Sequence, residues 1–443
     1  MNESLPAPGY RSVRENPWWI PPFLGGVPAS LSKDQLSLLG VLTFALFFER
    51  YDISIFSNAL KQLGTSFGLD KAQQGDFASW VLLGALPAFL LVPLADRVGR
   101  RRLLLFCVVV MSLGSVLTSL SQTALQFVLF QFATRAFLIS AALLTVVIVT
   151  EEFPAEHRGW GIGMLSGVAA IGFGLGALLF GFVNHLPFGW RTLYLVGATP
   201  LVLLPWLRRG VIETQRFHRA RGAELAREGS LQAILGGLRP LATLVREQPR
   251  RALALGLIGS LSSAGVNVAF LFLPEFLQSE RGWSPGGFAA MSIFFGVFGI
   301  VGNLAAGRLA DRFGRRAVIL CALLTFPLFA AAFYMGPPRF VPLPWTAMVF
   351  VNMANQVMLR ALTTELFPTR ARGAAGGLQA LLETLGVVFG SFVYARLLEW
   401  LGDQSLVLPL MSLATILAAL AVALVSETAR LELEQISDEG VPS

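Results

Sequence analysis

Long apolar runs, separated by short polar segments, repeat along almost the whole chain. A helix that crosses a membrane needs about 20 apolar residues, and twelve runs approach or exceed that length. The pattern therefore predicts an all-α membrane protein with twelve spans. These are expected at 36–60, 76–97, 101–121, 123–152, 157–183, 190–208, 251–278, 287–310, 316–336, 341–366, 372–400 and 404–426.

The longest polar segment between runs divides them into six and six. We expect residues 36–208 and 251–427 to form two six-helix bundles, joined by a cytoplasmic linker at 209–250. An N-terminal arm (1–35) and a short tail (428–443) flank them. The linker's second part predicts an amphipathic helix, the alternative being a solvated linker. The apolar positions at helical intervals are Leu231, Ile234, Leu235, Leu238 and Leu241.

Composition agrees with a chain embedded in lipid. Hydrophobic residues make up 54% and charged residues 14%, whereas soluble domains carry about 25% charged residues. The net charge is +7, but the basic residues sit in loops between apolar runs, so this charge does not indicate nucleic-acid binding. Cys107 and Cys321 each lie inside an apolar run and are predicted to be buried, unpaired thiols.

The distribution of basic residues predicts the topology. Of 34 Lys and Arg residues, 25 fall in segments that are cytoplasmic if both termini are cytoplasmic, and four fall within spans. Positive charge favours the cytoplasmic side, so we expect both termini there, in a bacterial inner membrane. The five residues left for external loops are Lys61, Lys71, Arg191, Arg281 and Arg339.

Two motifs occur twice at half-chain separation. Leu-Ala-Asp-Arg-x-Gly-Arg-Arg stands at 94–101 and again at 309–316, with the Asp residues 215 positions apart. Glu-x-Phe-Pro-x-x-x-Arg-Gly stands at 151–159 and at 365–373, 214 positions apart. Proline ends one helix and the Arg-Gly pair opens the next. We infer an internal repeat of two homologous halves.

These motifs resemble those of the major facilitator superfamily. The Asp-Arg-x-Gly loops are similar to its signature loop. The Glu-x-Phe-Pro elements and residues 211–217 are similar to motifs of its sugar-porter and organic-acid-symporter branches. Glu49-Arg50-Tyr51-Asp52, followed by Phe67-Gly68-Leu69, resembles span one of aromatic-acid/proton symporters. The resemblance implies two bundles that rock about a central cavity, so that the site opens to each side in turn.

The resemblance also implies that the repeated motifs control this movement by bracing the halves at the cytoplasmic side. Two departures stand out: Val92 replaces the first glycine of the signature loop, which the second copy keeps as Gly307, and Arg50 replaces a glycine of span one as an extra buried cation. The residues to which a gating role is carried over are Asp96, Arg97, Gly99, Arg100, Asp311, Arg312, Gly314, Arg315, Glu151, Arg158, Glu365 and Arg372.

Charged residues within spans need a partner or a water-filled cavity, because insertion costs about 2.5–3.5 kcal/mol each. Glu49 and Asp52 share one face of span one, and helix rise places Arg135 of span four near the same depth. We therefore expect Asp52 or Glu49 to face Arg135. An arginine partner favours the ionised carboxylate and burial the neutral one, which suits proton coupling. The alternative is a static salt bridge.

The second half contributes different polar residues. Glu383 lies about nine residues into span eleven, and its counterpart in the first half is Ala169. We interpret Glu383 as a cavity residue rather than a structural one. Asn267, Asn355 and Gln356 are candidate hydrogen-bonding residues of the cavity, with helix packing as the equal alternative.

No ATP-binding loop and no metal-spaced Cys/His set occurs in the sequence, so neither an enzyme nor an ATP-driven pump is indicated. We expect no cofactor and no metal. The sequence predicts a monomeric secondary transporter that moves a small polar or anionic metabolite, most simply by proton symport, with Arg50 or Arg135 as partner of an anion. The alternatives are a proton-driven exporter of drugs or metabolites and a non-transporting sensor on the same fold.

Overall fold

The computed structural model consists of α-helices joined by short turns. Parts of the predicted arm, the charged first part of the linker and the tail lie outside the residues it describes. The described residues are 20, 26–28, 31–205, 208, 230–367, 371–425 and 427.

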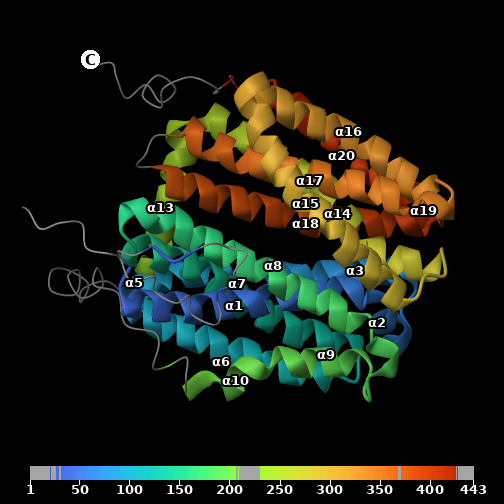
Figure 1. Ribbon diagram of the computed structural model, residues 1–443, viewed down its shortest axis with the longest axis horizontal. Helices are drawn as coiled ribbons and strands as arrows, with labels where there is room; N and C mark the ends of the chain where they lie inside the picture. The colour runs from blue at the N-terminus through green and yellow to red at the C-terminus, as the bar shows by residue number, and fades with distance from the viewer. Residues whose placement is uncertain are drawn as a thin grey trace, which may run out of the picture.

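The helices follow the twelve predicted apolar runs in order (Figure 1). The first bundle contains α1 (Lys33–Asn58), α2 (Leu60–Phe67), α3 (Lys71–Leu83), α4 (Ala88–Leu91), η2 (Val92–Leu94), α5 (Ala95–Val98), α6 (Arg100–Ser119), α7 (Ala124–Glu152), η3 (Ala155–His157), α8 (Arg158–Phe180), η4 (Val183–His185), α9 (Trp190–Gly197) and α10 (Thr199–Val202).

The second bundle repeats this order after the linker helix α13 (Ser230–Glu247). Among the described residues, eight helical stretches are long and apolar enough by themselves to cross a membrane. The helices of the second bundle are α14 (Pro249–Ser279), α15 (Pro285–Phe313), α16 (Arg315–Met335), η5 (Pro338–Phe340), α17 (Pro342–Leu366), α18 (Arg372–Leu401), α19 (Gln404–Ser412) and α20 (Ala414–Val422).

Span two is broken where the sequence places Gly84, Pro87 and Pro93. The prolines lack the backbone N–H that a continuous helix needs. A Cβ atom at Gly84 would lie 2.5 Å from the carbonyl oxygen of Phe132 in α7, so only glycine allows this approach of the two backbones. The break is a consequence of local sequence, but an apolar pattern alone does not reveal it.

Each signature loop turns at a glycine with a left-handed backbone. Gly99 has φ 101° and Gly314 has φ 95°, and they precede α6 and α16 respectively. Residues with a Cβ atom are strained in this conformation, which explains glycine at both positions. At Gly307 a Cβ would meet nothing within 4 Å. Close helix packing therefore does not explain why the second copy keeps a glycine where the first has Val92.

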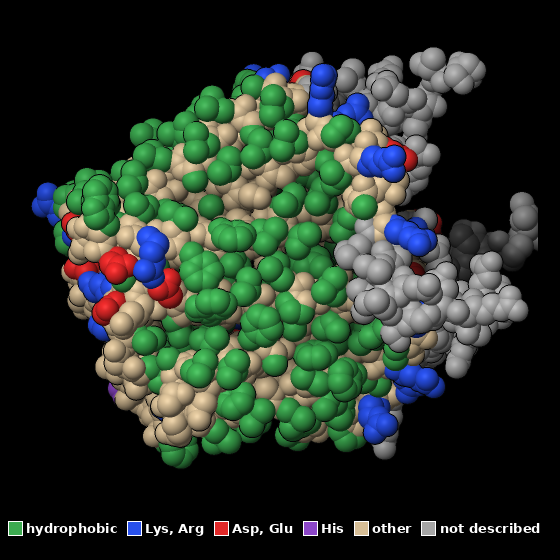
Figure 2. Space-filling model, turned by 180° about the vertical axis from the view of Figure 1, so that it is seen from behind, with side chains coloured by type: hydrophobic (Ala, Val, Ile, Leu, Met, Phe, Trp, Pro, Cys, Tyr) green, Lys and Arg blue, Asp and Glu red, His purple; other side chains and the backbone are tan. Residues whose placement is uncertain are grey.

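The surface is divided into an apolar belt and charged ends (Figure 2). Hydrophobic side chains cover the middle of the face shown, and Lys, Arg, Asp and Glu side chains gather toward its two edges. The chain is thus an integral membrane protein. The prediction that both cysteines are buried is half wrong: Cys107 is buried, but Cys321 is exposed on the outside of α16.

The two bundles pack together at the end opposite the signature loops. Two ion pairs cross between them there, Lys71 with Glu280 and Asp76 with Arg396. Ser57 Oγ of α1 also donates to the carbonyl oxygen of Leu271 in α14 at 3.0 Å. At the signature-loop end the linker helix α13 contacts both bundles, through α4 and η2 on one side and α14 and α18 on the other. The structure is therefore closed at the end that carries α2 and α19 (Figure 1).

Candidate substrate and proton site

A buried ion pair joins α1 and α7 inside the first bundle. Arg135 Nη2 lies 3.9 Å from Asp52 Oδ2, and both side chains are only 4% exposed. Gln131, one helical turn before Arg135, donates from Nε2 to Asp52 Oδ1 at 3.4 Å. The guanidinium of Arg135 lies over the ring of Phe56 at 4.7 Å, an attraction between cation and ring that steadies it. The structure thus brings Asp52 and Arg135 together.

Several polar atoms of this cluster lack a hydrogen-bond partner among the described residues. They include Asp52 Oδ2, Gln131 Oε1, Tyr194 Oη, and Nε and Nη2 of Arg135. A buried polar atom left unpaired costs about 1–3 kcal/mol, and such atoms in a native structure need an explanation. Unused donors and acceptors around one carboxylate suit a site that changes its protonation or admits water or solute during the transport cycle.

Glu49 has a different partner from Asp52. Arg50 Nε lies 3.0 Å from Glu49 Oε2, and the side chain of Glu49 is 4% exposed. The expectation that Arg50 is a buried cation is wrong, because its side chain is 46% exposed. Residues seven and eleven positions later on the same face, Ser57 and Lys61, bond to carbonyl oxygens of α14. Arg50 therefore faces the second bundle, on the part of α1 that α14 does not cover.

The second bundle holds a small polar pocket between α14, α17 and α18, which in this conformation is closed and has no room for a water molecule. The four residues that the sequence singled out in this half meet there, from three separate helices. Gln379 Nε2 donates to Glu383 Oε1 at 2.7 Å, and Asn355 Oδ1 is buried without a hydrogen-bond partner. The pocket is lined by Ser262, Ser263, Val266, Asn267, Asn355, Gln356 and Glu383.

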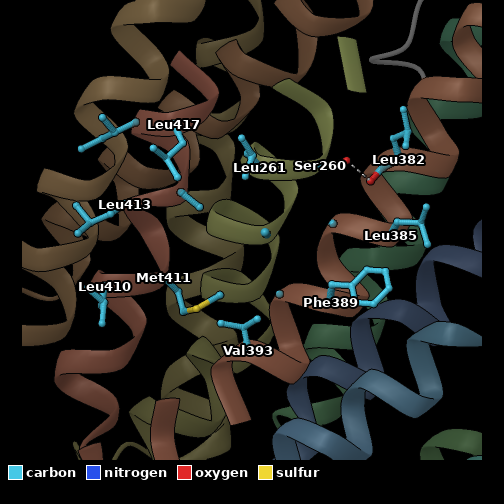
Figure 3. A pocket seen from close by; sticks show the side chains of 15 residues that line it. Ser260, Leu261, Leu382, Leu385, Phe389, Val393, Leu410, Met411, Leu413 and Leu417 are labelled. Atoms are coloured by element: carbon cyan, nitrogen blue, oxygen red, sulfur yellow. Dashed lines mark hydrogen bonds between the residues drawn. The ribbon is translucent and has the colours of Figure 1, made fainter. Parts of the chain in front are cut away.

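A larger groove of about 660 Å³ lies between α14, α18, α19 and α20 (Figure 3). Its lining is almost entirely aliphatic and aromatic, as Leu382, Phe389 and Leu417 illustrate. The hydroxyl of Ser260 is already bonded to the carbonyl oxygen of Leu382 at 3.1 Å. Because the groove offers no free polar partner, it does not suit a polar solute.

The repeated motifs form matching ion pairs within each bundle. Arg100 Nη2 lies 3.1 Å from Glu151 Oε1, and Arg315 Nε lies 2.5 Å from Glu365 Oε1. Arg315 also pairs with Asp311 of its own loop, at 3.6 Å from Nη1 to Oδ1. The side chain of Asp96 lies outside the described residues, so the corresponding pair in the first loop is not seen.

The remaining motif residues lie in the same loops. Arg158 Nε donates to the carbonyl oxygen of Phe153 at 3.1 Å, and the guanidinium of Arg312 lies over the Phe313 ring at 5.3 Å. Arg97 ends the short helix α5, and Arg372 opens α18.

Sequence reasoning missed two carboxylates. Glu427 accepts from the backbone N–H groups of Arg315 and Arg316, at 3.0 and 3.1 Å, and so caps α16. Glu275, 1% exposed in α14, accepts from Gln404 Nε2 at 2.5 Å. Glu275 had a signal in the sequence, since it is the single charge between Arg251 and Glu280.

Comparisons with known proteins agree with this architecture. The chain matches the family described as Major Facilitator Superfamily over residues 42–391 and again over 255–441. It is 26% identical to a gallate transporter of Pseudomonas putida, over 87% of this chain and 90% of that protein. It is 23% identical to a putative niacin/nicotinamide transporter of Bacillus subtilis, over 90% of this chain and 98% of that protein.

Among solved structures, the chain superposes on a D-xylose–proton symporter with a TM-score of 0.71. That alignment covers 89% of this chain and 98% of the symporter at 19% sequence identity. At this identity the likeness establishes the fold. The prediction of twelve helices in two six-helix bundles is thereby confirmed.

Proposed function

The chain belongs to the major facilitator superfamily and is a secondary transporter of small metabolites rather than an enzyme, and we propose that it imports a small polar or anionic solute together with protons. The single observation that carries this proposal is the buried Asp52–Arg135 ion pair, with unpaired polar atoms around it. A fixed structural salt bridge is most stable when all its donors and acceptors are bonded. In the Asp52–Arg135 pair several of them are unbonded.

Asp52 is the proton carrier in this proposal. Ionised, it is held by the charge of Arg135 and by the amide of Gln131. Protonated, it becomes a hydrogen-bond donor, and the unpaired Oε1 of Gln131 becomes its acceptor once the amide turns over. Both protonation states thus have a partner at the same place. The change in charge releases Arg135, and the bundles rock around the site.

The signature loops and both termini are assigned to the cytoplasm on the distribution of basic residues. The closed end, which carries the Lys71–Glu280 and Asp76–Arg396 pairs, is then the external end. In this proposal the protein is a monomer in a bacterial inner membrane, closed on its external side. The two pairs must break when the site opens outward.

The names of the relatives support a polar or anionic solute. The gallate transporter carries an aromatic acid by name, the niacin/nicotinamide transporter a pyridine acid or its amide, and the xylose symporter couples its sugar to protons. Polar groups on both bundles suit such solutes better than they suit a hydrophobic drug, which the alternative function of drug export requires. The third candidate, a sensor on the same fold, needs no proton-responsive pair.

The test is transport by purified protein in liposomes. Gallate, nicotinate and D-xylose are offered outside while the lumen is made alkaline relative to the outside. The proposal expects accumulation of at least one solute, lost when the gradient is collapsed with a protonophore. Gradient-driven expulsion would instead indicate an exporter, and binding without any flux would indicate a sensor.

A further inference from the structure

Arg50 is a cation with unused hydrogen-bonding capacity in the middle of a span. Its Nε faces Glu49 at 3.0 Å, and among the described residues no other carboxylate is paired with it. Its side chain is 46% exposed, although its helix is otherwise enclosed by neighbouring helices apart from one stripe. An arginine so placed needs a water-filled cavity or an anionic ligand.

Arg135, the other candidate for an anion, is differently placed. Its side chain is 4% exposed, between Asp52 and the Phe56 ring. In this conformation its guanidinium is closed to a solute. Of the two arginines, only Arg50 presents its guanidinium to the space between the bundles.

Arg50 lies at the same depth as the polar pocket of the second bundle. The Ser57–Leu271 contact fixes the register of α1 against α14. Both helices run away from the signature-loop end, at about 1.5 Å per residue. Measured from this contact, Arg50 lies about 10 Å toward the signature loops, Asn267 about 6 Å and Ser263 about 12 Å. A small molecule held at Arg50 therefore faces the amides across the gap.

The charges near Arg50 also select the ligand. Glu49 and Asp52 are balanced by Arg50 and Arg135. Once Asp52 carries a proton, the cluster has one positive charge in excess, which one anionic group neutralises. Because Glu49 lies against Nε, one edge of the guanidinium remains for a ligand, and a planar carboxylate matches two parallel N–H groups.

We propose that Arg50 anchors the carboxylate of a small monocarboxylic acid, whose remaining polar groups are read by the pocket of the second bundle. This inference rests on the proposed function for its substrate class. It also gives a role to Arg50, which stands where the resembling span-one pattern has a glycine. It also implies one proton carried for each monoanion.

The test compares acids with their own primary amides, which have the same shape without the charge. Nicotinate and nicotinamide, 4-hydroxybenzoate and 4-hydroxybenzamide, and lactate and lactamide are titrated into purified protein by calorimetry, without a pH gradient. Wild type should bind at least one acid about tenfold or more tightly than its amide. Arg50→Gln should remove that preference, and Arg50→Lys should keep part of it, because lysine retains the charge but not the planar fork.

Two further variants separate binding from folding and from charge in general. Glu49→Gln combined with Arg50→Gln removes the pair without stranding Glu49, and it should also lose the preference for acids. Arg339→Gln removes one exposed arginine of η5, away from both groups of polar residues, and should keep the preference for acids. Equal binding of acid and amide by wild type, no binding of any acid, or an unchanged preference in Arg50→Gln would overturn the inference.

The result is independent of proton coupling. If acids bind through Arg50 but no pH gradient drives uptake, the proposed symport is wrong and the anchor stands. If a neutral sugar accumulates with protons while every acid fails to bind, the symport stands and the anchor is wrong.

Discussion

The two bundles share a scaffold but not their buried polar groups. The first bundle holds a pair of opposite charges, with Asp52 and Arg135 at 3.9 Å. The second holds Glu383 beside amides and hydroxyls, with Gln379 donating to it at 2.7 Å, and a separate buried carboxylate, Glu275, bonded to Gln404. The motif repeat of 214 residues makes Val349 the counterpart of Arg135 and Ala169 the counterpart of Glu383. Neither counterpart can ionise.

This difference indicates a division of labour within a symmetric fold. Repetition of the motifs preserves the glycine turns and the Arg–Glu ion pairs at the signature-loop end, and we propose that both bundles use them in order to move. The buried polar and charged residues in the middle of the membrane are not repeated and differ between the two bundles. A charge pair suits proton coupling, whereas amides and hydroxyls suit recognition of a solute by hydrogen bonds.

The largest effect is expected from removing the cation of the first bundle. Arg135→Ala strands Asp52 in a buried place, and breaking a buried pair from one side costs about 3–5 kcal/mol. Both thermal stability and transport should fall sharply. The matched control is Val349→Ala in the second bundle, where loss of two methyl groups costs about 1–2 kcal/mol. Similar melting temperatures for the two variants in detergent would show that the pair contributes little.

A smaller effect is expected from Glu383→Gln in the second bundle. Glutamine keeps the size of the side chain and an oxygen that can accept from Gln379. Stability should therefore stay near that of wild type, while solute affinity changes by about tenfold, as for one hydrogen bond to a charged group. Titration calorimetry and a melting curve measure both quantities. A large fall in melting temperature with unchanged affinity would make Glu383 a structural residue.

The smallest effect on stability is expected at the signature loops. Asp311 pairs with Arg315 across the turn at Gly314 while its side chain is 77% exposed, and exposed pairs contribute about 0.2–1 kcal/mol. Asp311→Asn and Asp96→Asn should fold normally but slow the transport cycle, because the loops favour one conformation. The initial rate of counterflow measures this step. Wild-type rates in both variants would remove the bracing role from this protein.

Much of the fold could be predicted from the sequence because lipid imposes a length on apolar runs. The run at 123–152 became α7, which starts after the capping residue Thr123 and ends before Pro154. Helix rise also placed Asp52 and Arg135 at one depth. The break in span two was not predicted, because it follows from Gly84, Pro87 and Pro93 and not from the apolar pattern on which the spans were based.

The candidate site was predicted less completely than the fold. Glu49 and Asp52 lie one turn apart on the same face, so spacing alone left the partner of Arg135 open. The structure distinguishes them because Arg50 bends back onto Glu49. Arg50 is exposed because α14 does not cover that part of α1, and this depends on how the two helices pack. No periodicity within one helix contains that information.

The central claim is that Asp52 carries the proton, and Asp52→Asn tests it most directly. Asparagine mimics the protonated carboxyl, so solute binding and exchange remain possible but net proton movement does not. In the same vesicles, uptake against a pH gradient and counterflow without one are measured. In Asp52→Asn, accumulation should be lost while counterflow persists. Full gradient-driven accumulation by Asp52→Asn would contradict it and leave Glu49 as the remaining carboxylate of the first bundle's cluster.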